Sequence, residues 1–146
     1  MKKILDKKQI LIMSLVLSVI GVMIAGYLTM VHYSLNGIAC NIDNNGCNPV
    51  LSSEYAVFMG IPIAILGLLY YLALSALMTY ELFGEKYSMI KLFTLLTSIG
   101  VLISMYLVYI QAFIIEAFCY YCLGSALVTT LLLVLDILLI REFRET

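Results

Sequence analysis

The chain has 146 residues, of which 64% are apolar and 12% are charged, and its formal net charge is −1. Water-soluble globular domains are about 45–50% apolar, so this composition excludes an ordinary soluble domain. Because opposite charges cancel in the total, the positions of the charges along the chain are more informative than their sum.

Four stretches lack Asp, Glu, Lys, Arg and His: residues 9–31, 55–80, 92–115 and 117–135. Each is close to or longer than the ~18 uncharged residues that a membrane-spanning helix requires. The sequence therefore predicts an all-α membrane protein, in which residues 1–146 form a single domain built as a four-transmembrane-helix bundle.

The positive residues lie before the first predicted helix, between the second and third, and after the fourth: Lys2, Lys3, Lys7, Lys8, Lys86, Lys91, Arg141 and Arg144. Lys and Arg are enriched in the cytoplasmic segments of membrane proteins. Both termini are therefore predicted to face the cytoplasm, and the first and third connections to face outward. We expect a multi-pass protein of the plasma membrane whose active face is extracytoplasmic.

Three features refine the predicted helices. The first helix has small residues at spacings of three and four, which is typical of close packing in membranes: Ser14, Ser18, Gly21 and Ala25. Gly60-Ile61-Pro62 is expected to open the second helix, since proline is tolerated in a first turn. Asp136 precedes Arg141 by little more than one turn, and we expect it to snorkel to the cytoplasmic boundary or to pair with a cation.

The outer connection 34–54 is rich in Asn and Gly, which are typical turn formers, and it contains Cys40 and Cys47. A disulfide between these two cysteines would close a short polar loop and stabilise it by roughly 2–3 kcal/mol before strain. An exposed and strained bridge of this kind would also exchange readily with other thiols.

The second cysteine pair, Cys119 and Cys122, forms a Cys-x-x-Cys where the last apolar stretch begins. If a helix starts there, the two residues share one face, with their Cα atoms about 5 Å apart, which suits a disulfide. The positive end of the helix dipole favours a thiolate at Cys119. The motif therefore indicates reversible disulfide chemistry at the membrane boundary.

Cysteine spacing alone leaves three uses open: a relay between the two pairs, two static bridges, or a metal site. The six residues between Cys40 and Cys47 exceed the usual two to four of zinc motifs, and we expect no metal. Leu123 stands where haem attachment requires His. A relay suits two pairs on one side, because a soluble thiol protein could reach the loop pair and a membrane quinone could collect two electrons from the other.

A quinone is expected to lie in an apolar, aromatic cavity among the four helices beside Cys122, with Phe118, Tyr120 and Tyr121 nearby. We predict that Cys122, Tyr121 and Ser53 bind the quinone. Of these, Ser53 enters only through the family resemblance described next.

An ordered set of residues resembles the vitamin K epoxide reductase family over roughly residues 9–140. The set consists of Cys40, Cys47, Val50-Leu51-Ser52-Ser53, Gly60-Ile61-Pro62 and Cys119-Tyr120-Tyr121-Cys122. The resemblance implies a four-helix bundle around a quinone. It further implies that Cys119 and Cys122 are the active-site pair, that Cys40 and Cys47 shuttle electrons to it, and that Ser53 lies beside the pocket.

Two positions depart from the animal enzymes of that family. Ala126 replaces a pocket Tyr, and Ile63 stands near the place of a pocket Asn. Because of these departures, the resemblance does not imply hydrogen bonds to vitamin K epoxide. It does not imply sensitivity to coumarin anticoagulants either. The chain is more similar to bacterial and archaeal members, which oxidise a thioredoxin-like partner and reduce a membrane quinone such as menaquinone or ubiquinone.

The predicted function is thus a membrane thiol:quinone oxidoreductase that supports disulfide formation outside the cytoplasm. Because the sequence ends at Thr146, we expect the thioredoxin-like partner to be a separate protein, and we expect no nucleic-acid partner. Another bacterial quinone-coupled thiol oxidase has its two cysteine pairs in the reverse order. The alternative from a different class is a small transport or scaffold protein with structural disulfides.

Overall fold

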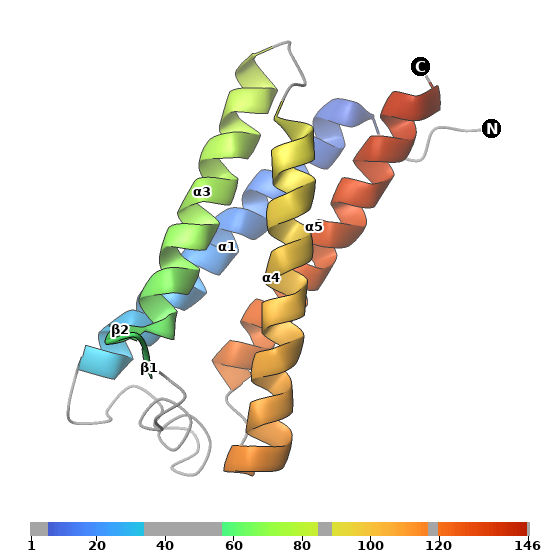
Figure 1. The fold of residues 1–146 in the computed structure, drawn as a ribbon. Helices are drawn as coiled ribbons and strands as arrows, with labels where there is room; N and C mark the ends of the chain where they lie inside the picture. The colour runs from blue at the N-terminus through green and yellow to red at the C-terminus, as the bar shows by residue number, and fades with distance from the viewer. Residues whose placement is uncertain (1–5, 34–56, 85–88, 117–119, 146) are drawn as a thin grey trace.

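The computed structural model describes residues 6–33, 57–84, 89–116 and 120–145 (Figure 1). Four long helices dominate it: α1 (Lys7–Tyr33), α3 (Ile63–Phe83), α4 (Ile90–Ile110) and α5 (Tyr120–Glu145). The short strands β1 (Val57–Phe58) and β2 (Ile61–Pro62) precede α3, and a π-helical turn, η3 (Gln111–Ile115), prolongs α4. All four helices are long and apolar enough to cross a membrane, which confirms the predicted helical, multi-pass architecture.

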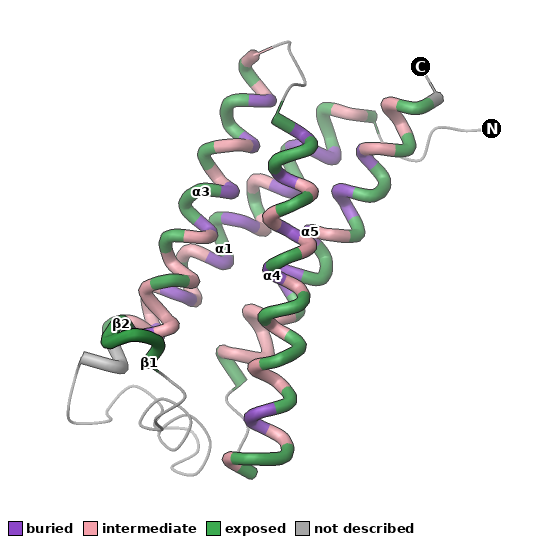
Figure 2. The backbone as a smooth tube through the Cα atoms, in the orientation of Figure 1, coloured by how far each residue is buried: buried purple, intermediate pink, exposed green. Residues whose placement is uncertain are grey.

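The helices are not packed equally tightly. α1 packs along α3 and α5, and α5 packs along α4, whereas α3 and α4 touch only sparsely. In Figure 1, α3 and α4 lie close where α3 ends and α4 begins, and they diverge toward the opposite end. Figure 2 shows that buried residues follow the inward faces of the helices while the outer faces are exposed. A membrane would cover those apolar outer faces.

The two ends of the bundle differ in charge. The start of α1, the end of α3, the start of α4 and the end of α5 lie together at one end (Figure 1). This end, called the charged end below, carries every Lys and Arg of the described residues: Lys7, Lys8, Lys91, Arg141 and Arg144. The opposite end, called the hairpin end, comprises β1, β2, η3 and the start of α5. Which end faces the cytoplasm stays a prediction.

The small residues of α1 are buried, in agreement with their expected packing role, but they accommodate two different neighbours. Near Ala25, the backbones of α1 and α3 approach closely, and a Cβ added to Gly67 would lie 3.9 Å from the Cβ of Ala25. At Gly21, the neighbour is instead the ring of Tyr71, which a Cβ would overlap. Gly21 therefore lets a tyrosine from α3 pass across α1.

The expected start of the second helix at Gly60-Ile61-Pro62 is wrong by a few residues. β1 and β2 form a small antiparallel hairpin in which Phe58 is paired with Ile61. Its turn residues, Met59 and Gly60, have φ values of 52° and 82°, which a right-handed helix does not allow. Pro62 is the N-cap, so α3 begins at Ile63.

The expectation that Asp136 snorkels or pairs with a cation is also wrong. Its side chain is 0% exposed, and its Oδ1 accepts a hydrogen bond of 3.2 Å from the hydroxyl of Thr94 on α4. The reason is that α5 continues to Glu145, well past the apolar stretch, so Asp136 lies inside the helix and faces α4.

Candidate active site

Two of the predicted site residues, Cys122 and Tyr121, are among the described residues. Cys40, Cys47, Ser53 and Cys119 lie outside them. The pairing of the cysteines and the place of Ser53 therefore stay predictions.

Cys122 is the third residue of α5, which begins at Tyr120. The last helix therefore starts within the Cys-x-x-Cys motif, as predicted. The thiol of Cys122 is half-buried, and it faces into the bundle rather than away from it, because it lines a cavity among the helices. This position exposes a sulfur atom to any molecule that occupies the cavity.

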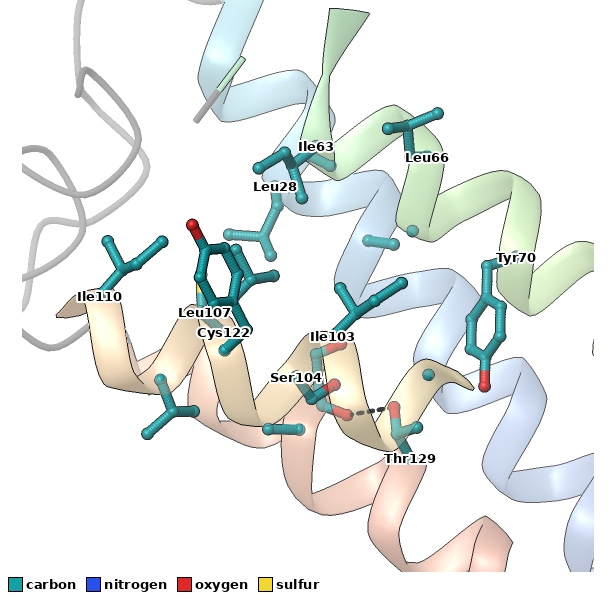
Figure 3. Close-up of a pocket in the computed structure, with 18 of the residues that line it drawn as sticks. Leu28, Ile63, Leu66, Tyr70, Ile103, Ser104, Leu107, Ile110, Cys122 and Thr129 are labelled. Carbon is teal, nitrogen blue, oxygen red and sulfur yellow. Dashed lines mark hydrogen bonds between the residues drawn. The ribbon is translucent and has the colours of Figure 1, made fainter. Parts of the chain in front are cut away.

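The cavity has a volume of about 520 Å³ and is lined by residues from all four helices (Figure 3). Ile63, Leu66 and Tyr70 of α3 lie on one side, and Ile103, Ser104 and Leu107 of α4 lie on the other. Leu28 of α1 and Cys122 and Thr129 of α5 complete the lining. Cavities of about 300–1,000 Å³ with mainly apolar walls are typical small-molecule sites. The size and lining fit a small, mainly apolar molecule.

The cavity opens sideways, between α3 and α4. Leu66 on α3 and Ile103 and Tyr106 on α4 line it, yet they are 39%, 53% and 62% exposed. These two helices touch each other only sparsely. In a chain that spans a membrane, this opening faces lipid, so an apolar ligand can reach Cys122 from the bilayer without crossing water.

A cluster of hydroxyl groups provides polar atoms in this mainly apolar cavity. Cys122, Ser125 and Thr129 follow one another at spacings of three and four, so they lie on one face of α5. The hydroxyl oxygen of Tyr71 is 2.8 Å from each of three oxygens: Ser125 O, Ser125 Oγ and Thr129 Oγ1. The cluster therefore joins α3 to α5 one to two turns from the thiol.

Tyr70 closes the deep end of the cavity. Its hydroxyl donates a hydrogen bond of 3.1 Å to the carbonyl oxygen of Leu96, so the side chain crosses from α3 to α4. It passes directly over Gly100, where an added Cβ would lie 2.6 Å from Tyr70 Cζ and 3.0 Å from Thr129 Cγ2. Gly100 is therefore the position on α4 that makes this closure sterically possible.

The hairpin and η3 border the other end of the cavity. Phe58 and Pro62 of the hairpin line it, as do Gln111 and Ile115 of η3. A π-helical turn widens a helix locally and often occurs at functional sites. Here it ends at Glu116, which adopts the left-handed conformation with a φ of 56°. Irregular backbone is thus concentrated beside the cavity.

The departures from the animal enzymes both lie in the cavity wall, because Ile63 and Ala126 line it. Tyr121, in contrast, is not among the lining residues. Its ring packs against Tyr27 of α1, with the centroids 4.8 Å apart. A role for Tyr121 in binding stays a prediction, and no contact with the cavity supports it.

The sequence interpretation did not identify Tyr71, Ser125 or Thr129. The helical spacing from Cys122 to Ser125 and Thr129 was a signal for two of them, since it places hydroxyls on the face of the thiol. Tyr71 has no comparable signal, because its partner Ser125 lies 54 positions away in the sequence.

A comparison with known protein families matches residues 12–137 to the one described as the Vitamin K epoxide reductase family. The matched range covers most of the chain. It includes every described element that borders the cavity, from α1 to most of α5.

Proposed function

The chain belongs to the vitamin K epoxide reductase family, and on that premise we propose that it is a thiol:quinone oxidoreductase of the membrane. Family membership and four candidate spanning helices indicate a multi-pass membrane protein with a redox function. In this proposal, electrons pass from a separate thioredoxin-like protein to Cys40 and Cys47, then to Cys119 and Cys122, and finally to a membrane quinone.

The observation that carries the proposal is the position of Cys122 in the wall of the cavity. A quinone head group is a flat, mainly apolar ring with two carbonyl oxygens. The cavity offers it apolar walls, hydroxyl groups and a thiol within one space of about 520 Å³. Its opening between α3 and α4 suits a ligand that is dissolved in the bilayer.

The redox steps balance without a further reactant. When the thiols of Cys119 and Cys122 form a disulfide, two electrons and two protons are released. Reduction of a quinone to a quinol consumes both. Exchange between this disulfide and the thiols of Cys40 and Cys47 then restores the first pair, and the resulting loop disulfide oxidises the dithiol of the partner.

The charge distribution supports an outward-facing site. The charged end carries all Lys and Arg of the described residues, and such residues favour the cytoplasmic side. Cys122 lies near the hairpin end, which would then face the extracytoplasmic side, where disulfides persist. This placement accounts for a role in disulfide formation outside the cytoplasm.

The alternative, a transport or scaffold protein with structural disulfides, is not favoured by the family assignment. A transporter would be expected to place ionisable groups along its pathway. The buried acids of the described spans are Glu81 and Asp136, and neither lines the cavity. Glu81 instead accepts a hydrogen bond of 2.7 Å from the backbone N–H of Met89, which ties the end of α3 to the start of α4.

Steady-state turnover tests the proposed function. The purified chain in lipid nanodiscs is mixed with menaquinone and a reduced thioredoxin-like protein, and quinol is followed by its ultraviolet absorbance. We expect quinol to form with the unaltered chain and not with Cys122→Ala. Thr130→Ala serves as the control, because Thr130 is exposed on the outer face of the same helix. Equal activity of Cys122→Ala and Thr130→Ala would contradict the proposal.

A further inference from the structure

We propose that the hydroxyl of Ser125 donates a hydrogen bond to one carbonyl oxygen of the quinone, and that Tyr71 positions this hydroxyl. The inference rests on the proposed function and adds to it a specific donor. In this scheme Ser125 is a catalytic residue, because it touches the substrate. Tyr71 acts through Ser125.

The geometry of α5 places Ser125 beside the reacting thiol. Ser125 follows Cys122 by three residues, so the two side chains are neighbours on one helix face. Helical side chains tilt toward the N-terminus, which directs the Ser125 hydroxyl toward the turn that carries Cys122. Both residues line the cavity. A quinone ring in contact with the thiol therefore lies within reach of this hydroxyl.

Two other lining residues are less suited to donate. After Ser125, the next lining residue along α5 is Ala126, which has no side-chain donor. Tyr70 already donates its proton to the carbonyl oxygen of Leu96 at 3.1 Å. Ser125 is the lining residue closest to Cys122 along α5 that carries a hydroxyl, and its proton is not committed to a single acceptor.

Counting protons shows how the cluster can release a donor. Thr129 donates to the carbonyl oxygen of Ser125 at 3.0 Å. The hydroxyl of Tyr71 has one proton to donate, but its oxygen lies 2.8 Å from three oxygens of Ser125 and Thr129. With an empty cavity, Ser125 can donate to the oxygen of Tyr71 while Tyr71 donates to the Ser125 carbonyl oxygen. Every hydroxyl proton of the cluster is then used.

When a quinone binds, the hydroxyl groups of Ser125 and Tyr71 can rotate into a second hydrogen-bond arrangement. Ser125 turns its proton to the quinone carbonyl, and Tyr71 donates to Ser125 Oγ. Each bond in such a chain polarises the next, so Tyr71 makes Ser125 a stronger donor. The carbonyl oxygen gains negative charge as electrons arrive from the thiols, and the bond from Ser125 strengthens during that step. Ser125 keeps its proton, and the two protons of the quinol come from the thiols.

A symmetric probe makes this bond visible without turnover. The probe is naphthoquinone methylated at both ring carbons that thiols could attack, with isotopic labels in both carbonyl groups. Free in a membrane, its two carbonyls are equivalent and give one labelled infrared band. Bound to the oxidised full-length chain, one carbonyl hydrogen-bonded to Ser125 should shift to lower frequency, so the band should split.

Matched variants assign the donor. Ser125→Ala should abolish the splitting and lower kcat about tenfold or more, with a much smaller change in KM, because the bond strengthens in the reacting state. Tyr71→Phe should keep a smaller splitting and lose less of kcat. Thr130→Ala, whose hydroxyl bonds the Ala126 carbonyl oxygen at 2.9 Å on the exposed face, should behave as the unaltered chain.

The outcomes separate this inference from the proposed function. If the unaltered chain reduces the probe but the splitting survives in Ser125→Ala, Ser125 is not the donor. If the splitting disappears in Tyr71→Phe and not in Ser125→Ala, the donor is Tyr71 and the assigned roles are reversed. If the unaltered chain neither binds nor reduces the probe, the proposed function fails together with the inference.

Discussion

Replacing Gly100 by alanine should test how the cavity is closed at its deep end. A Cβ at Gly100 would overlap the hydroxyl of Tyr70 and lie 2.6 Å from its Cζ and 3.0 Å from Thr129 Cγ2. Tyr70 would have to move and release its hydrogen bond to the Leu96 carbonyl oxygen. The ring would then enter the cavity or leave its deep end open.

The expected loss of stability follows from three contributions. Forcing an extra carbon into a packed site costs about 1–3 kcal/mol, and losing the hydrogen bond of Tyr70 costs about 0.5–1.5 kcal/mol. Alanine in place of glycine stabilises a helix interior by about 1 kcal/mol, which offsets part of the loss. The free energy of unfolding should therefore fall by roughly 0.5–3.5 kcal/mol, and quinol formation should slow as well.

The assay is SDS-induced unfolding in mixed micelles, followed by far-ultraviolet circular dichroism. Gly26→Ala is the matched control on α1, because its nearest neighbour would be Leu68 Cδ1 at 4.0 Å, and we expect no loss. Adding Tyr70→Phe to Gly100→Ala removes the hydroxyl that collides and should recover part of the stability. The reasoning is refuted if Gly100→Ala behaves as Gly26→Ala and Tyr70→Phe leaves its effect unchanged.

Three further predictions concern the charged end, the orientation and the relay. Glu81→Ala should lower the free energy of unfolding by about 1–2 kcal/mol, because the carboxylate caps the first turn of α4; Glu81→Gln, which keeps an acceptor oxygen, should lose less, and equal losses would argue against capping. A membrane-impermeant thiol reagent should label Cys40 or Cys47 in intact, mildly reduced cells, and labelling that requires permeabilised cells would reverse the orientation. Cys122→Ser should trap a disulfide between Cys47 and Cys119, detectable by non-reducing proteolysis and mass spectrometry, whereas a trapped Cys40–Cys119 peptide would exchange the roles of the two loop cysteines.

The four spans could be predicted from the sequence because a membrane excludes charge, and uncharged stretches of sufficient length are rare outside it. The ends of the helices could not be predicted as well. α3 begins at Ile63, after the Met59-Gly60 turn, although the uncharged stretch starts earlier. α5 continues to Glu145, because charged residues extend a helix beyond the apolar region without breaking it. Lack of charge marks the membrane, whereas backbone conformation and caps determine where a helix begins and ends.

The site was predictable to the extent that it lies on one helix. The Cys-x-x-Cys and its helical spacing predicted a cavity beside Cys122, and Cys122 does line one. The cluster around Ser125 depends on Tyr71, which reaches it across Gly21 of α1. Sequence spacing indicates that Gly21 allows close approach, but it does not say whether a helix backbone or an aromatic ring approaches. That choice is made by the packing of α1, α3 and α5 together.

A single-turnover experiment tests the central claim, which is that the dithiol of Cys119 and Cys122 gives its electrons directly to a quinone. The fully reduced chain in nanodiscs is mixed with one equivalent of the dimethylated naphthoquinone, quenched at short times with acid, and digested under non-reducing conditions. We predict one quinol per chain and, at the earliest times, a disulfide between Cys119 and Cys122 with the loop cysteines still reduced. Absence of quinol, or quinol formed at the earliest times while this pair is still reduced, would contradict the account.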